Sequence, residues 1–215
     1  PRARRALRSR KSWDMIIERH SLFSRAGRKL ADKQSIPLVL EVNAPLYQER
    51  MRFETVYRPK FAQDWERDVL LSADHVVAVS AWLKAWLEQE IGCSNVTHIP
   101  NAVTPTIGNA KRGRALLGIT DQRAIVGFVG SMKPWHGLEF LAELATRIDS
   151  HVVCLGQGKV PSSLHQYSTY DPQRLADVIS AFSVGLAPYR GDAPPWFSPL
   201  KIMQYRAQGI PIVAP

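Results

Sequence analysis

The chain has 215 residues, of which 45% are hydrophobic, and a formal net charge of +9. This length and composition predict a folded protein with one large or two modest domains, and no apolar run is long enough to span a bilayer. The basic opening segment is not followed by an apolar signal core either, which favours a cytoplasmic protein. The only cysteines, Cys93 and Cys154, lie far apart in the sequence, which argues against a zinc site or a disulfide framework.

The first element along the chain is basic. Residues 1–11 contain six Arg or Lys residues and no acid. An amphipathic helix here would contact anionic lipid headgroups at the cytoplasmic face of a membrane, and a solvated helix face is the alternative. Nucleic-acid binding would require a basic face interleaved with exposed aromatics or a known motif. Neither is evident, so we expect no nucleic-acid partner.

Short runs of Val, Ile, Leu and Ala then alternate with amphipathic segments, a pattern typical of parallel sheets covered by helices. We expect strands at 14–18, 37–42, 75–79, 96–99, 124–129, 151–155, 184–187 and 211–214. We expect helices at 22–33, 59–71, 81–90, 111–117, 138–148, 172–180 and 199–208. The predicted fold class is therefore α/β with parallel sheets.

Two regions interrupt this alternation. Residues 100–109 are rich in turn formers, so we place a boundary there between domains 1–104 and 105–215. Both halves look incomplete, which indicates a fragment of a longer protein. Between 155 and a further apolar run at 164–167 there is no room for a covering helix, so this run is either a loop or a strand whose helix has been lost.

Polar residues follow several predicted strands of the first half. His20 could act on a hydroxyl or contact phosphate, or it could be a surface histidine at a helix entry. Glu41 interrupts an apolar run and needs a partner such as Arg19, because a buried carboxylate is costly without one. Ser80 most simply caps a helix, and Asn101 most simply makes a turn.

The second half has a glycine-flanked loop after a predicted strand. Gly130 and Gly137 allow the backbone to approach a ligand closely, while Lys133 and His136 could neutralise phosphate charge. The loop matches neither the Walker pattern nor the dinucleotide fingerprint. Taken singly, it indicates a phosphate site only weakly.

The last helix has a well-marked start. Ser198 can accept from the amides of the first turn, and Pro199 suits the first helical position, ahead of Leu200. Free amides and the positive end of the helix dipole would seat a phosphate or pyrophosphate. The alternative is an ordinary α/β repeat with no ligand.

In this order, these segments resemble glycosyltransferase family 4, whose members have two facing Rossmann-like domains, the GT-B fold. The matching segments are ERHSLF (18–23), LVLEVNAPL (38–46), ADHVVAVS (73–80), IPNAV (99–103), VGFVGSMKPWHG (126–137), LAPY (186–189) and FSPLKIMQYRAQGIPIVA (197–214). The resemblance covers nearly the whole chain from residue 14 onward.

The resemblance implies a site that holds a nucleotide-sugar donor. Its donor-binding residues would be Gly130, Ser131, Lys133, His136, Ser198, Pro199, Leu200 and Gln204. Gln204 takes the position of the glutamate that binds the donor ribose. Asn43 stands near the place of an active-site histidine, and Glu41 and His20 complete the expected catalytic set. Family members generally retain anomeric configuration and need no bound metal, so no cofactor besides the donor substrate is expected.

The sequence departs from the family at charged positions. The paired glutamates fall on Trp196 and Gln204, the arginine after the strand-end glycine is Ser131, and the lysine before the next glycine is His136. A glutamine still donates to and accepts from ribose hydroxyls, whereas a tryptophan does not replace a carboxylate. We therefore expect this chain by itself to be inactive.

The resemblance leaves three hypotheses for the full-length protein. The first is a retaining glycosyltransferase of the hexosyltransferase type, with a nucleotide-sugar and a hydroxyl acceptor as partners, in polysaccharide or glycolipid synthesis. The second is a non-catalytic nucleotide-sugar-binding module of the same fold. The third is a GT-B nucleotide-sugar epimerase, which would need paired carboxylates that the sequence does not offer.

Overall fold

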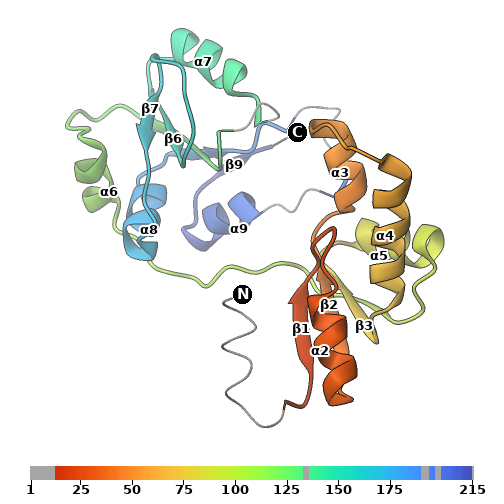
Figure 1. The fold of residues 1–215 in the computed structure, drawn as a ribbon. Helices are drawn as coiled ribbons and strands as arrows, with labels where there is room; N and C mark the ends of the chain where they lie inside the picture. The colour runs from red at the N-terminus through yellow and green to blue at the C-terminus, as the bar shows by residue number, and fades with distance from the viewer. Residues whose placement is uncertain (1–12, 133–135, 190–193, 197–199, 215) are drawn as a thin grey trace. The chain divides into compact units, whose positions relative to one another are not determined.

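The computed structural model describes residues 13–132, 136–189, 194–196 and 200–214. These residues form two compact units. Unit 1 comprises the described residues of Pro1–Asn101 and Pro195–Ser198, and unit 2 those of Ala102–Pro194 and Pro199–Pro215. Figure 1 traces most of unit 1 in red to yellow and unit 2 in green to blue. Within the described residues, no helix has the length and apolar character that crossing a membrane requires.

Unit 1 is built on a four-stranded parallel sheet with the strands in sequence order, β1-β2-β3-β4. The strands are β1 (Ile16–Arg19), β2 (Leu38–Val42), β3 (His75–Ala78) and β4 (Val96–His98). The helices between them are α2 (Ala26–Gln34), α3 (Leu46–Phe53), α4 (Pro59–Leu71), α5 (Ala81–Trp86) and the π-helical η1 (Leu87–Ile91). Each parallel neighbour needs a crossover, and these helices supply it.

Helix α3 was not predicted from the sequence. Its N-cap residue, Pro45, offers no side-chain cap. The capping group comes instead from α4, where the Glu66 carboxylate accepts from the backbone N–H groups of Leu46 (2.7 Å) and Tyr47 (3.1 Å). A carboxylate at a helix N-terminus satisfies free donors and complements the dipole. The capping signal for α3 is therefore non-local. The cap of α5 is local by contrast, because the Ser80 hydroxyl accepts from the backbone N–H of Leu83, as predicted.

Unit 2 is built on a five-stranded parallel sheet in the order β7-β6-β5-β8-β9. The strands are β5 (Ile125–Val129), β6 (His151–Leu155), β7 (His165–Tyr167), β8 (Val184–Leu186) and β9 (Ile212–Val213). The helices are α6 (Ala110–Leu117), α7 (Leu138–Arg147), α8 (Pro172–Ser180) and α9 (Leu200–Ala207). This α/β arrangement confirms the predicted fold class.

The central strand β5 is buried throughout and separates two hydrophobic clusters. Ile125 and Val129 pack with α8 and with Tyr205 of α9, whereas Val126 and Phe128 pack in a different cluster with α7. The alternation follows the two-residue period of a strand. Unit 2 therefore has three layers, with helices on both faces of the sheet (Figure 1).

Strand β7 resolves the irregularity after residue 155. Residues 165–167 pair in parallel with β6, so the chain makes this crossover without a helix. Gln166 stabilises the connection, because its side-chain amide donates to the carbonyls of Gly156 (3.0 Å) and Gly158 (2.7 Å). The run is a strand, which is the second of the two alternatives that the sequence left open.

Helix α9 is fixed to the sheet by Tyr205, which is fully buried. Its hydroxyl accepts from the backbone N–H of Val129 (2.9 Å) and donates to the carbonyl of Leu186 (3.0 Å). These partners are the last residues of β5 and β8. The first turn of α9 is thereby held at the carboxyl ends of these two strands.

Candidate functional site

The carboxyl edge of the unit 2 sheet is lined by backbone rather than by bulky side chains. Gly130 directly follows β5 and Gly156 directly follows β6. A Cβ on Gly156 would lie 2.0 Å from the carbonyl oxygen of Gly130, and the φ of Gly156 is +150°. A side chain at this position would clash with the neighbouring loop. Open α/β sheets bind ligands at this edge.

His136 lies in the loop between β5 and α7. Its Nδ1 donates to the backbone carbonyl of Ser131, and its ring meets Phe128 edge-on with 5.5 Å between centroids. Burial and the nearby positive charge of Lys201 lower the pKa of His136. This histidine therefore carries less positive charge near neutral pH than an exposed one would.

Lys201, in the first turn of α9, belongs to the same group of side chains, although sequence reasoning did not select it. It is only 9% exposed, and its Nζ lies 4.3 Å from the ring centroid of Phe128 and 5.0 Å from that of Tyr189. Burial lowers the pKa of Lys201 to about 8. The available signal was its spacing, because it precedes the buried Tyr205 by one helical turn and so shares its face.

The predicted donor-binding residues divide into three groups. Gly130, Ser131 and His136 lie together in the loop after β5, as the glycine and hydrogen-bond contacts indicate. Leu200 opens α9 and Gln204 lies one turn further on. Lys133, Ser198 and Pro199 are outside the described residues. The donor-binding roles of all these residues stay predictions.

In unit 1, Glu41 and Asn43 interact at the carboxyl end of β2. The Nδ2 of Asn43 donates to Glu41 Oε1 (2.6 Å), and the Nδ2 of Asn101 donates to Asn43 Oδ1 (3.4 Å). The expected partner Arg19 lies on the neighbouring strand in register with Glu41, but its side chain forms no ion pair with Glu41 among the described residues. The predicted Arg19–Glu41 pair is therefore wrong, and a nearby amide satisfies the carboxylate instead.

His20 is buried, with a side chain only 1% exposed. Its Nε2 lies 3.1 Å from Glu66 Oε1, the carboxylate that also caps α3. This contact corrects the expectation of a surface histidine at a helix entry. The catalytic role assigned to His20 stays a prediction, and its described contacts serve the structure of unit 1. Sequence reasoning missed Glu66, since an acid within an amphipathic helix normally faces solvent.

Trp196 belongs to unit 1, although the predicted domain boundary assigned it to the second half. It is 6% exposed and packs in the hydrophobic core of unit 1, where its ring lies 5.4 Å from that of Trp82. The position that aligns with the first motif glutamate therefore carries a core side chain.

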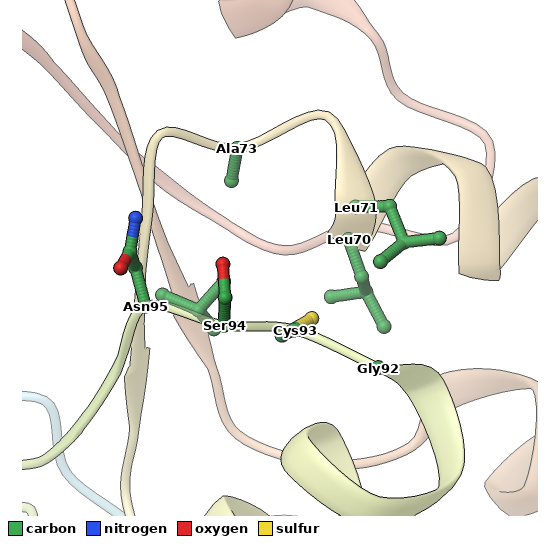
Figure 2. A pocket seen from close by; sticks show the side chains of 8 residues that line it. Leu70, Leu71, Ala73, Gly92, Cys93, Ser94 and Asn95 are labelled. Carbon is green, nitrogen blue, oxygen red and sulfur yellow. The ribbon is translucent and has the colours of Figure 1, made fainter.

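A small hollow of about 60 Å³ lies in unit 1 (Figure 2). It is lined by residues that end α4, precede or begin β3, or precede β4: Leu70, Leu71, Ala73, Val76, Gly92, Cys93, Ser94 and Asn95. These residues surround the amino ends of β3 and β4, opposite to the edge at which such sheets bind ligands. Burial raises the pKa of Cys93, so its thiol is not activated. The hollow is no candidate for the main site.

Metal ligands do not gather in the part of the chain that the structure describes: no three His, Cys, Asp or Glu side chains there could hold an ion together. The expectation that the protein needs no bound metal stays a prediction.

Comparisons with known proteins agree with this arrangement. The family model for Glycosyltransferase Family 4 matches residues 1–106. A comparison of the sequence with curated proteins finds no match.

Several solved structures resemble the chain in fold. Sucrose-phosphate synthase from Thermosynechococcus elongatus aligns with a TM-score of 0.74 and 18% identity, over 98% of this chain and 58% of that one. A glycosyltransferase from Rickettsia africae aligns with a TM-score of 0.56 and 13% identity, over 86% of this chain and 59% of that one. A UDP-glucose:anthocyanidin 3-O-glucosyltransferase in complex with UDP aligns with a TM-score of 0.51 and 12% identity, over 97% of this chain and 58% of that one.

The chain thus spans a little under three fifths of the length of the first two of these structures. The expected resemblance is confirmed at both levels: residues 1–106 match Glycosyltransferase Family 4, and the chain has the α/β fold of the GT-B glycosyltransferases.

Proposed function

We propose that the protein containing this chain transfers a sugar from a nucleotide-activated donor to a hydroxyl acceptor, and that unit 2 binds the donor. The observation that carries the proposal is the carboxyl edge of the unit 2 sheet. The backbone at Gly130 and Gly156 approaches closely there, and the half-buried His136 and the buried Lys201 supply basic side chains. A diphosphate needs close backbone and positive charge of this kind.

The chemistry follows from where charge develops. When the bond between sugar and diphosphate breaks, negative charge grows on the leaving diphosphate. Positive groups and backbone N–H donors fixed in advance lower the energy of that state. We propose that the residues at the carboxyl edge of unit 2 have this role, and that Gln204 contacts the ribose.

The finer assignments rest on the family resemblance alone. We propose transfer of a hexose with retention of configuration, without a bound metal, in polysaccharide or glycolipid synthesis at the cytoplasmic face of a membrane. Asn43 and Glu41 are the proposed catalytic side chains of unit 1, where they already share a hydrogen bond.

A second candidate function is a binding module that has lost catalysis. It is favoured by Trp196, because the position of the first motif carboxylate is occupied by a buried core side chain. Such a module would bind the nucleotide-sugar without transferring the sugar.

Calorimetric titration of the 215-residue chain with UDP, GDP and ADP tests both candidates. We expect one of the three to bind with a dissociation constant in the micromolar to millimolar range. The absence of binding by all three would contradict both functions. A donor-hydrolysis assay on the full-length wild-type protein and on its Gln204→Glu variant then separates them, because hydrolysis by the wild type excludes the non-catalytic module.

A further inference from the structure

Lys201 is a buried cation that has no acidic partner among the residues that the structure describes. Its side chain is 9% exposed, and among the described residues it forms neither an ion pair nor a hydrogen bond to an acceptor. The groups around its Nζ are the rings of Phe128 from β5 and Tyr189 after β8, with His136 nearby from the loop before α7. None of these three is an acid.

An unpaired buried charge is costly, and the aromatic rings offset only part of the cost. Cation–π contacts stabilise an ammonium group by less than its desolvation costs. The lowered pKa of Lys201, about 8, reflects this imbalance. A negatively charged ligand at this position would compensate the buried charge of Lys201.

The position of Nζ identifies where such a ligand would lie. Tyr205 anchors α9 to the cluster on one face of the sheet, whereas Phe128 belongs to the cluster on the other face. Strands β5 and β8 pair with each other up to Phe128, so the sheet is closed between them there. The side chain of Lys201 therefore reaches the Phe128 ring by passing the carboxyl ends of the two strands. Nζ is therefore at the edge where Gly130 leaves the backbone accessible.

We propose that Lys201 binds the diphosphate group of the nucleotide donor as its main cation. This inference rests on the proposed function and names a residue for it. Burial lowers the pKa of both residues, but the ordinary pKa of a lysine is well above that of a histidine. Near neutral pH Lys201 therefore keeps its charge while His136 has lost part of its own. Ser131, at the other end of the loop, carries no charge. Of these three residues, Lys201 thus carries the most positive charge near neutral pH.

Binding of UDP, GDP, ADP and inorganic pyrophosphate to wild-type, Lys201→Met and Lys201→Arg chains tests the proposal. Loss of one charge-assisted contact should weaken binding of the preferred diphosphate about 10- to 100-fold in Lys201→Met, and Lys201→Arg should restore a large part of it. Arg206→Met is the matched control, because it removes a positive charge from an exposed site on the same helix. It should leave binding nearly unchanged.

The variant is expected to fold. Methionine keeps the unbranched chain and makes favourable contacts with aromatic rings, and the buried unpaired charge disappears. Thermal unfolding of Lys201→Met should therefore occur at the wild-type temperature or above it. A purely structural lysine would instead lower that temperature and leave the affinity of the folded protein unchanged.

The pH profile of the wild-type chain is a readout that needs no variant. Affinity should fall as pH rises through about 8, since Lys201 then loses its proton. Neighbouring groups titrate outside this window, because the pKa of His136 is lowered from 6.5 and that of Tyr189 is raised from 10.

Two outcomes would overturn the inference. Wild-type affinity in Lys201→Met with the same pH profile would contradict Lys201 as the diphosphate cation while leaving the proposed function in place. If the wild-type chain binds none of the probes, the proposed function fails together with the inference.

Discussion

Single residues in this protein differ in how their buried charge is satisfied. Glu66 accepts from two backbone N–H groups and faces His20. Asp177 accepts two bonds from Arg112, which, with other donors, lowers the pKa of Asp177 to about 2. Among the described residues, Lys201 has two aromatic rings and His136 near its charge, and no acid. The first two arrangements are complete within the fold, whereas the third is complete only with an anion.

Replacing Glu66 tests the non-local cap of α3. In Glu66→Gln one carboxylate oxygen becomes an NH₂ group, which faces an N–H donor and leaves it without an acceptor. We expect a loss of about 1 to 3 kcal/mol in the free energy of unfolding, measured by urea denaturation. Asp64→Asn on the same helix is the control, because among the described residues Asp64 pairs with Lys60 alone, in an exposed bridge worth little. Equal stability of both variants would contradict the capping role.

At the scale of elements, close packing of α6 on α8 in unit 2 depends on a glycine (Figure 1). A Cβ at Gly113 of α6 would lie 2.0 Å from the backbone carbonyl oxygen of Asp177 in α8. The neighbouring ion pair from Arg112 to Asp177 joins the same two helices. The approach at Gly113 requires the helix backbones to lie close together, and the ion pair adds a second link between them.

Gly113→Ala tests which of two opposing effects is larger. Alanine favours an isolated helix over glycine by about 1 kcal/mol. The clash is with backbone, which cannot move aside as a flexible side chain can, and overpacking typically costs about 1 to 3 kcal/mol. We expect net destabilisation in thermal or urea unfolding, with no loss in Lys111→Ala on the exposed side of α6. A stabilised Gly113→Ala would show that the helices separate easily.

At the scale of the whole molecule, charge is distributed unevenly along the chain. The net charge is +9, and residues 1–11 contribute six positive charges and no negative ones. Clustered basic residues are attracted to anionic lipid by about 1 kcal/mol each near the surface. We propose that this segment gives the protein an affinity for anionic membranes.

Vesicle sedimentation tests this proposal. The wild-type chain should sediment with vesicles containing phosphatidylserine and much less with neutral phosphatidylcholine vesicles, and added salt should release it. A variant with Arg2→Gln, Arg4→Gln, Arg5→Gln and Arg8→Gln should lose most of this binding. Equal sedimentation of the variant, or equal binding to neutral vesicles, would contradict the proposal.

The α/β fold class and most elements could be predicted from the sequence, because they depend on local patterns. Helices α4 and α8 begin at prolines and have the predicted bounds, Pro59–Leu71 and Pro172–Ser180. Buried parallel strands can be recognised in a sequence as continuous apolar runs, as at His151–Leu155. The glycine-flanked loop after β5 could also be predicted, since glycine, lysine and histidine near a strand end are a local pattern.

Features that depend on contacts between distant residues could be seen only in the folded protein. The cap of α3 comes from Glu66 on another helix, and the core of unit 1 takes in Trp196 from far along the chain. No local pattern encodes such partners. In the sequence, nothing distinguishes Lys201 from other lysines on amphipathic helices. Its special environment arises from the fold, which places Phe128 and Tyr189 around it. Whether a charge is buried, and whether anything neutralises it, follows from packing and not from the order of residues.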